Sequence, residues 1–257
     1  NLPEPEFREW ERRIGFKSLR TWISDANDAL EDVRTEVEHE LWLEKYEDII
    51  KIEESEVKAV IEHPFAQVFA NRNGEFMIGE IYSKTYEDKI VYIRDGDRNK
   101  LEYAKTLEKS DLENDIVIDN FSYLNLTKRN GCSTYQDIYR AHGKYRVNYI
   151  MGYLIGIDPN TNDRYTSVWI FLKGQRRNWL GIYKDYDADL KWMECAWKVI
   201  DNWGRPFTRA EHVKESSGGR VKSIYEIHHL YDYTPASQFT SHYFEYNKGK
   251  GTSNFLD

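Results

Sequence analysis

The chain has 257 residues, of which 40% are hydrophobic and 31% are charged, a balance that excludes disordered and collagen-like proteins. Its net charge of −8 is uneven, because residues 1–130 hold 19 Lys+Arg against 30 Asp+Glu, whereas residues 131–257 hold 17 against 14. An acidic first half repels phosphates and argues against a nucleic-acid partner. No apolar run reaches the roughly 20 residues that span a bilayer, and the length favours two domains.

The N-terminal part has helical periodicity. A short helix is expected over residues 6–14, ended by Gly15. Residues 18–46 then place apolar side chains at steps of three and four, with Ser18 as the N-cap. A further helix is expected over residues 54–62. We assign the tryptophans of this part to helix–helix packing rather than to a cofactor site: Trp10, Trp22 and Trp42.

The period changes after Asn73-Gly74, a dipeptide that favours a turn. Residues 76–81 alternate, and a second apolar run covers residues 90–93, which predicts a small β-hairpin or meander. Residues 105–134 have no clean period and several acidic residues, and we interpret them as a connection between domains.

The second half alternates. From Tyr145 to Ile157 every second residue is apolar or aromatic, which predicts a strand with one packed face. Strands are also expected over residues 165–173, 179–184, 221–233 and 239–246, with turns between them, and residues 190–200 fit either a strand or a helix. The predicted class is α+β: a helical region with a β-hairpin (1–104), a connection (105–134) and an antiparallel, aromatic-rich, sandwich-like or open-barrel domain (135–257).

Two segments contain metal-binding residue types. Asp158, Asn160 and Asn162 alternate as in a calcium loop, but Asp163 and Trp169 stand where an EF-hand needs Gly and Glu, so a polar hairpin loop is the other interpretation. If residues 221–233 and 239–246 pair, His229 lies opposite His242. A zinc site normally needs three or four ligands, and His228 lies on the other face of its strand. The other interpretation is that these residues are surface or half-buried histidines.

No catalytic pattern is evident. The chain has no Gly-x-Ser-x-Gly elbow and no phosphate loop. The two cysteines lack a neighbouring histidine, and they are either bridged or separate thiols: Cys132 and Cys195. Two charged groups could form sites. Asp185, Asp187 and Asp189 could serve acid/base catalysis on a sugar, and Lys173, Arg176 and Arg177 could bind a phosphate or sulfate. The alternative for each group is a solvated turn. We therefore assign no catalytic, cofactor-binding or metal-binding residue.

Aromatic residues concentrate in the second half, with 15 of 38 in residues 1–134 and 23 in residues 135–257. Such side chains suit glycan or peptide binding and equally suit a β-sandwich core. Four of them lie near expected strand ends, where an exposed platform is possible: Trp169, Trp179, Tyr183 and Trp203.

Short motifs in residues 7–95 carry a family resemblance: Trp10-Glu11, Gly15-Phe16-Lys17-Ser18-Leu19, Pro64-Phe65-Ala66 and the run from Asn71 to Gly79. Together they resemble uncharacterised families of secreted or lipid-anchored proteins from gut Bacteroidetes. The resemblance implies a cell-envelope location (periplasm, outer membrane or extracellular) and no assigned activity. An oxidising compartment would permit a Cys132–Cys195 bridge.

These observations lead to three hypotheses. The first is a non-enzymatic envelope protein that binds a glycan, a peptide or a partner protein through its β-domain, with no transmembrane segment and, if a leader has been removed, a possible lipid anchor. The alternatives are a carbohydrate-active hydrolase, which needs two carboxylates with shifted pKa values in a cleft, and a structural or assembly subunit.

Overall fold

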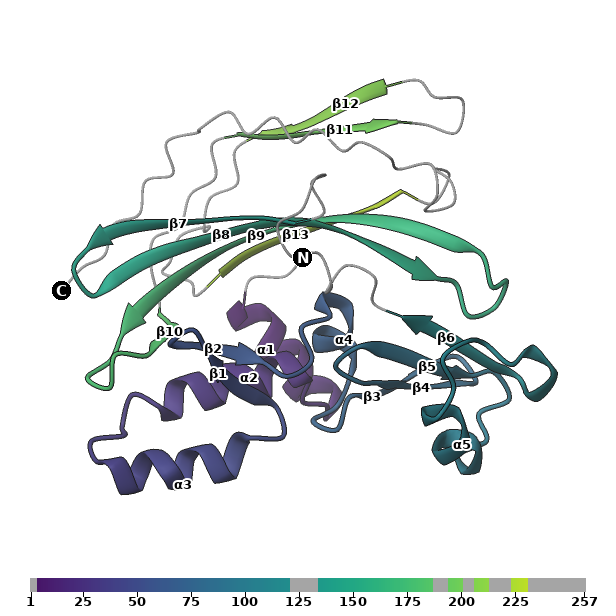
Figure 1. Cartoon of the computed structure of the whole chain (residues 1–257), viewed down its shortest axis with the longest axis horizontal. Helices are drawn as coiled ribbons and strands as arrows, with labels where there is room; N and C mark the ends of the chain where they lie inside the picture. Colours follow the sequence, from purple (N-terminus) through teal and green to yellow (C-terminus); the bar gives the residue numbers. More distant parts are fainter. Residues whose placement is uncertain (1–3, 121–133, 187–193, 201–205, 213–222, 231–257) are drawn as a thin grey trace. The chain divides into compact units, whose positions relative to one another are not determined.

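A computed structural model describes residues 4–120, 134–186, 194–200, 206–212 and 223–230 (Figure 1). The chain forms two compact units. The helical unit comprises residues 2–120 and 177–185, and the β unit comprises residues 121–176 and 186–257 together with Asn1. Helices are followed by antiparallel strands, which confirms the α+β class. Among the described residues, no helix has the length and apolar character needed to cross a membrane.

Three helices open the helical unit: α1 (Glu4–Ile14), α2 (Leu19–Ala29) and α3 (Glu36–Tyr46). The expected N-cap is confirmed, because Ser18 Oγ accepts the Thr21 N–H at 3.2 Å. The continuous helical pattern over residues 18–46 is wrong in one respect, since the chain breaks between α2 and α3. Thr35 and Glu38 form a complete capping box there, and it starts a new helix.

A hairpin follows α3, formed by β1 (Ile50–Glu53) and β2 (Glu56–Ala59). The helix expected over residues 54–62 is therefore wrong. Glu54 and Ser55 adopt positive φ values of 52° and 62°, which make the tight turn between the strands. The helix in this region comes later, as α4 (Pro64–Phe69), which begins with proline in its first turn.

The expected hairpin after Asn73-Gly74 is confirmed as part of a larger antiparallel sheet. Its strands are β3 (Glu75–Ile78), β4 (Ile81–Thr85), β5 (Lys89–Ile93) and β6 (Ile116–Asn120), paired in that order. The short helix α5 (Leu101–Lys105) lies between β5 and β6 in sequence. Strand β6 falls inside residues 105–134, so the first part of the expected connection belongs to a folded sheet.

Two hydrophobic cores stabilise the helical unit. The larger core joins the helices to the hairpin and includes Ile182 from the distant segment 177–185. Its largest buried members are Leu19, Leu30, Trp42, Tyr46, Ile49 and Ile50. The second core lies between α5 and one face of the four-stranded sheet, and includes Tyr82, Val91, Ile93, Ala104, Ile116 and Ile118.

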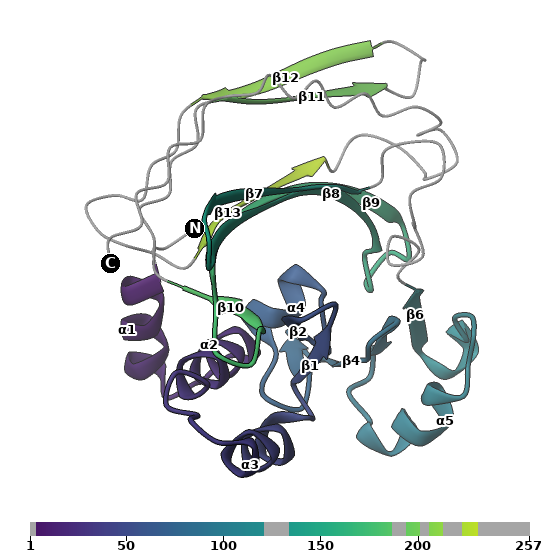
Figure 2. The same cartoon turned by 60° about the vertical axis from the view of Figure 1, so that its left-hand side comes forward.

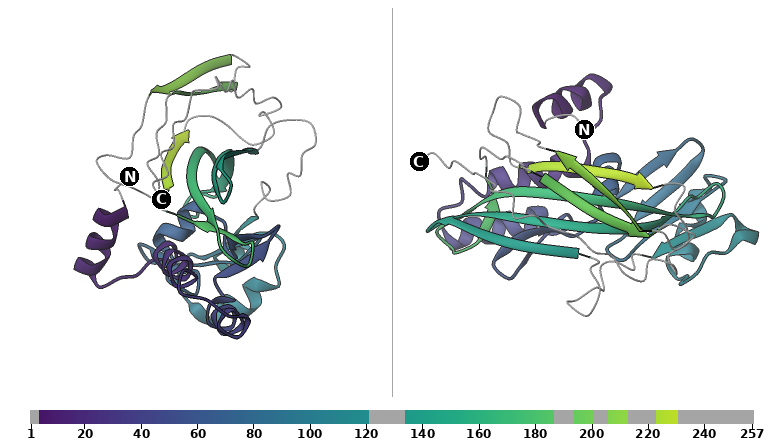
Figure 3. Two further views of the ribbon diagram at one scale, coloured as in Figure 1. Left: turned by 90° about the vertical axis from the view of Figure 1, so that its left-hand side faces the viewer. Right: turned by 90° about the horizontal axis from the view of Figure 1, so that it is seen from above.

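The β unit contains a sheet of long strands: β7 (Thr134–His142), β8 (Tyr145–Ile157), β9 (Arg164–Arg177) and β13 (Ser223–Leu230). Strand β8 has the bounds that the alternation predicts. It pairs with β9 from Tyr145↔Arg176 to Ile157↔Arg164, and Figure 2 shows the two strands curving together. Strand β13 pairs with the other edge of β9, alongside it in the right-hand view of Figure 3.

Strands β11 (Glu194–Ile200) and β12 (Pro206–His212) form a separate antiparallel pair, so residues 194–200 are a strand and not a helix. The turn expected over residues 174–178 is wrong, because β9 continues to Arg177. Its extension is held at Gln175, a buried side chain whose Oε1 accepts from Arg146 Nε at 2.7 Å.

Candidate functional site

Trp179 is an exposed aromatic side chain held in a fixed position. It follows the end of β9, and 52% of its surface is exposed. Its indole Nε1 donates a hydrogen bond to the Val33 carbonyl at 2.9 Å, although the two residues are 146 positions apart. Because one edge of the ring is anchored, the exposed part of the indole has a defined orientation without any ligand.

The turn that carries Trp179 is built by Asn178. Its Oδ1 accepts from Ile182 N at 3.0 Å, and Gly181 adopts a φ of +83° to close the turn. Arg177 donates from Nε to the Gly181 carbonyl at 3.0 Å, and its guanidinium lies 5.9 Å from the centre of the Tyr183 ring. The exposed indole therefore follows, two residues later, an exposed guanidinium, a group that can bind hydroxyls.

Lys184 anchors the same segment inside the helical unit. Its side chain is 1% exposed, and its Nζ lies 2.5 Å from Glu31 Oε1 and donates to the Asn27 carbonyl at 3.1 Å. The backbone N–H of Asp185 donates to Asn27 Oδ1 at 3.1 Å. Strand β10 (Tyr183–Asp185) also pairs in parallel with β2, through Tyr183 opposite Glu56. These contacts hold the segment that presents Trp179.

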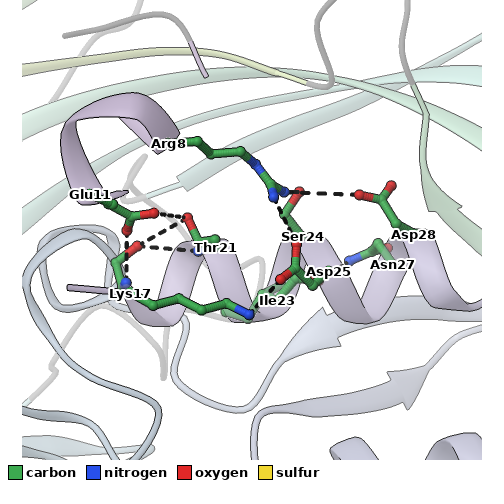
Figure 4. Close-up of polar contacts among 10 residues, drawn as sticks. Arg8, Glu11, Lys17, Thr21, Ile23, Ser24, Asp25, Asn27 and Asp28 are labelled. Carbon is green, nitrogen blue, oxygen red and sulfur yellow. Dashed lines mark hydrogen bonds and ion pairs between the residues drawn. The ribbon is translucent and has the colours of Figure 1, made fainter. Parts of the chain in front are cut away.

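A polar network joins α1 to α2 (Figure 4). Glu11 is 3% exposed and accepts from the Ser18 N–H at 2.7 Å and from Thr21 Oγ1 at 2.6 Å. Arg8 reaches Asp25 at 2.8 Å and Ser24 Oγ at 2.8 Å. These hydrogen bonds and the ion pair engage the side chains of Arg8, Glu11 and Asp25 in fixing the angle between the two helices. The network therefore has a structural role.

Asp25 lies between two cations, because Lys17 Nζ also approaches it at 2.6 Å. Burial alone would raise the pKa of Asp25, but hydrogen bonds from Lys17 and Arg8 more than offset this effect and hold the pKa below its ordinary value. The carboxylate stays charged at neutral pH. It cannot act there as a proton donor.

His63 precedes α4 and caps it. The side chain is 1% exposed, and its Nδ1 accepts the Ala66 N–H at 3.2 Å. Burial lowers the pKa of His63 to about 3, so the ring is neutral at physiological pH and keeps the lone pair that the cap needs.

Tyr82 and Glu75 form a polar pair on the four-stranded sheet. The Tyr82 hydroxyl donates to Glu75 Oε1 at 3.1 Å. Burial, together with the Glu75 carboxylate, raises the pKa of Tyr82 to about 12. In the described part of the chain, each carboxyl group with a clear shift has a pKa below its ordinary value: Asp25, Glu38, Asp48, Glu53, Glu75, Asp95 and Asp111. A general acid needs the opposite shift, so these groups give no support to a hydrolase.

The Asp158 segment forms the loop between β8 and β9. Asp158 Oδ1 accepts from the Asn160 N–H at 2.8 Å, and Asn162 has a φ of +63°. The Asp158 N–H donates to the Asp163 carbonyl at 2.8 Å. The residues therefore have the hydrogen bonds of a polar hairpin loop. Among the described residues there is no group of three or more His, Cys, Asp or Glu side chains placed to hold a metal ion.

The structure describes only some of the residues in the histidine and cysteine hypotheses. His228 and His229 lie in β13, opposite Val168 and Ser167 of β9. Cys195 lies in β11, opposite Glu211. Their expected partners, His242 and Cys132, lie outside the described residues, so the zinc pair and the disulfide stay predictions.

Of the two charged groups, only the basic one lies wholly within the described residues, and it belongs to a strand; the turn expected at Asp185, Asp187 and Asp189 stays a prediction. Asp185 ends β10, whereas Asp187 and Asp189 lie outside the described residues. Lys173, Arg176 and Arg177 belong to β9. Arg176 places its guanidinium 4.4 Å from the centre of the Tyr186 ring.

The predicted aromatic positions separate into core and surface. Trp42 is 4% exposed and donates from Nε1 to the Ala26 carbonyl at 2.9 Å. Trp22 packs against the same core, and Trp10 stacks on Phe7. Of the four candidate platforms, Trp179 is exposed. Trp169 lies opposite Gly152 in the β8–β9 pair, and Trp203 lies outside the described residues.

Sequence reasoning missed a polar layer on the four-stranded sheet. Ser83 and Thr85 on β4 are 0% and 1% exposed, and neither hydroxyl has a hydrogen-bond partner in the described part of the chain. Tyr92 on β5 lies opposite Ser83, and the buried Asp119 on β6 lies opposite Ile90. The alternation of these strands could have indicated that both faces of the sheet are packed. The residues on the second face are polar, however, and so they give no apolar signal.

No family model, curated protein or solved structure matches this chain. The resemblance to envelope proteins of Bacteroidetes therefore stays a prediction.

Proposed function

We propose that this protein is a non-enzymatic binding protein and that the exposed ring of Trp179 is a stacking surface for a glycan. The observation that carries the proposal is the half-exposed indole, fixed through its Nε1 by the Val33 carbonyl. Sugar rings present apolar C–H faces that pack on flat aromatic side chains. A ring that is already oriented loses little conformational entropy on binding.

One exposed polar side chain lies close to this ring in sequence. Arg177 is exposed, and its guanidinium has N–H groups besides the Nε–H that bonds the Gly181 carbonyl. Polar groups beside an aromatic surface are typical of ligand sites. A cell-envelope location, secreted or lipid-anchored, belongs to the same proposal and is supported by the family resemblance alone.

Oligosaccharide binding tests the proposal. The purified protein is screened on a glycan array and then titrated with a soluble oligosaccharide from the bound class, with the heat of binding in isothermal titration calorimetry as the readout. We expect Trp179→Ala to weaken binding about tenfold or more, equal to about 1.4 kcal/mol. Trp179→Phe keeps a flat ring but loses the Nε1 anchor, so its affinity should lie between those of the native protein and Trp179→Ala. Tyr103→Ala is the matched control, because Tyr103 is also half exposed, at 49%.

Two outcomes contradict the proposal. One is an array without any bound glycan. The other is an unchanged affinity in Trp179→Ala, provided that circular dichroism shows the variant to be folded. If a peptide array binds in place of the glycan array, the ligand class is wrong, although Trp179 can still be the contact.

A further inference from the structure

Helix α3 has apolar residues on both faces. Its inner face places Trp42 and Tyr46 in the core, where they are 4% and 6% exposed. Val37 and Leu41 lie one turn apart on the outer face and are 65% and 60% exposed. Since a helix turns about 100° per residue, this pair lies roughly opposite Trp42 and Tyr46. Packing of the helix onto its own unit therefore does not account for the outer pair.

Acidic residues flank the outer pair. Glu36, Glu40 and Glu44 recur at intervals of four residues, and all three are exposed. Glu36 lies in the first turn, where the helix dipole favours an acid. Glu40 and Glu44 have no such benefit. Like charges one turn apart destabilise a helix, and Glu44 lies near the C-terminal end, where the helix dipole disfavours an acid.

Two other acids of the same unit are neutralised, whereas Glu40 and Glu44 are not. Asp48 pairs with Arg72 at 2.7 Å, and Glu53 pairs with Lys58 at 3.2 Å. No ion pair engages Glu40 or Glu44 within the part of the chain that the structure describes. The outer face thus combines an exposed apolar pair with an uncompensated row of negative charge.

We propose that the outer face of α3 is a docking surface for a basic, amphipathic segment of a partner protein. The occupant has apolar side chains at helical spacing that cover Val37 and Leu41, and Lys or Arg residues that face Glu40 and Glu44. Charge complementarity selects this occupant, because a neutral or acidic segment would leave the row of carboxylates repelled or uncompensated. The proposal does not depend on glycan binding by Trp179.

A defined peptide tests this surface. The probe is a short fluorescein-labelled helical peptide with leucines on one face and lysines on the other, and binding to the full protein is measured by fluorescence anisotropy. The first control peptide has the same composition in scrambled order. The second has glutamate in place of lysine.

Two variants change the surface. Leu41→Ser removes an apolar contact, and the double variant Glu40→Gln/Glu44→Gln removes the charge. We expect each to weaken binding of the basic peptide about tenfold. The matched controls are Leu112→Ser, at a residue that is 48% exposed, and Glu102→Gln/Glu113→Gln, and these should leave the affinity unchanged.

The folding readout separates binding from damage. Removing the Glu40–Glu44 repulsion should leave the melting temperature unchanged or raise it, while peptide binding falls. The proposal is overturned if the basic peptide does not bind, or if the scrambled or acidic peptide binds equally well. It is also overturned if the controls lose as much affinity as the variants, or if only one of the two surface variants has an effect.

Discussion

Two carboxylates join α1 to α2 in different ways. Glu11 is almost completely buried and its oxygens accept two short hydrogen bonds, from Ser18 N and Thr21 Oγ1. Asp25 is one-third exposed and is held by the charges of Arg8 and Lys17. The contact of Asp25 is an ion pair with two cations, and it should respond to pH and salt.

Asp25→Asn tests the charged contact. The folded pKa of Asp25 is lower than its ordinary value of 3.8, so its stabilising contribution is present above that value and is lost as the pH falls through the folded pKa. We expect a loss of about 1 kcal/mol in the free energy of unfolding at pH 7, since the partial exposure screens the pair. Urea unfolding at pH 7 and near pH 2 measures the difference, which should disappear in acid. Asp32→Asn, at an exposed position, is the control.

His63→Asn tests the buried cap. The folded pKa of about 3 is below the ordinary 6.5, so the unfolded chain binds the extra proton between these values. The protein should lose stability as the pH falls through this range, by up to about 1.4 kcal/mol per pH unit. Asparagine can cap a helix without titrating, so the variant should have a shallower pH dependence in urea titrations. An unchanged slope would show that another group causes it.

Among the secondary-structure elements, two glycine turns set the positions of the first strands of the four-stranded sheet. Gly74 leads into β3 with a φ of +79°, and Gly79 lies between β3 and β4 with a φ of +60°. Both positions need the left-handed conformation. They differ in their surroundings, because a Cβ on Gly74 would lie 2.7 Å from the Thr85 carbonyl oxygen, whereas a Cβ on Gly79 would meet nothing within 4 Å.

The two glycines form a matched pair of variants. Gly79→Ala should cost about 1 kcal/mol, which is the strain of a positive φ alone. Gly74→Ala should cost at least about 2 kcal/mol more, because the backbone of β4 must move. Thermal melts of both variants measure the comparison. Equal costs would mean that the close approach at Gly74 relaxes freely.

Elements that are marked by neighbouring residues in the sequence were predictable. Elements were not predictable where two patterns compete over the same residues. The β8 bounds follow from the strict alternation between Tyr145 and Ile157, and the start of α2 follows from the hydroxyl of Ser18. The break before α3 was missed because its apolar residues continue the same period across the capping box at Thr35. Residues 54–62 have a mixed pattern, and the positive φ angles at Glu54 and Ser55 are not evident from glutamate and serine.

The candidate site was also predictable only in the features that neighbouring residues mark. An aromatic residue at Trp179 near a strand end was predictable as a possible platform. Its anchor was not, because the hydrogen bond to Val33 joins residues 146 positions apart. The lysine that holds the segment was equally hidden, since a single Lys184 in a polar stretch does not indicate burial.

At the scale of the whole molecule, the helical unit depends on a segment from late in the sequence. Residues 177–185 supply Ile182 to its larger core and Lys184 to its interior. Lys184→Met keeps the aliphatic volume and removes the ammonium group from Glu31 and the Asn27 carbonyl. We expect it to cost about 1–2 kcal/mol in urea unfolding, because the buried Asn27 carbonyl loses its donor while the partly exposed Glu31 stays hydrated. Lys109→Met, at an exposed position, should change stability by less than about 0.5 kcal/mol, and similar effects at both positions would contradict the anchoring role.

The discontinuous helical unit also sets an order of events during synthesis. When Asn120 leaves the ribosome, the larger core still lacks Ile182, and the 56 residues from Phe121 to Arg176 must be translated first. At about 5–20 residues per second this interval lasts about 3–11 s. During that delay the nascent chain exposes an incomplete apolar surface, which is the kind of surface that chaperones bind, and the last nine residues of the unit seal it only after most of the long hairpin has been made.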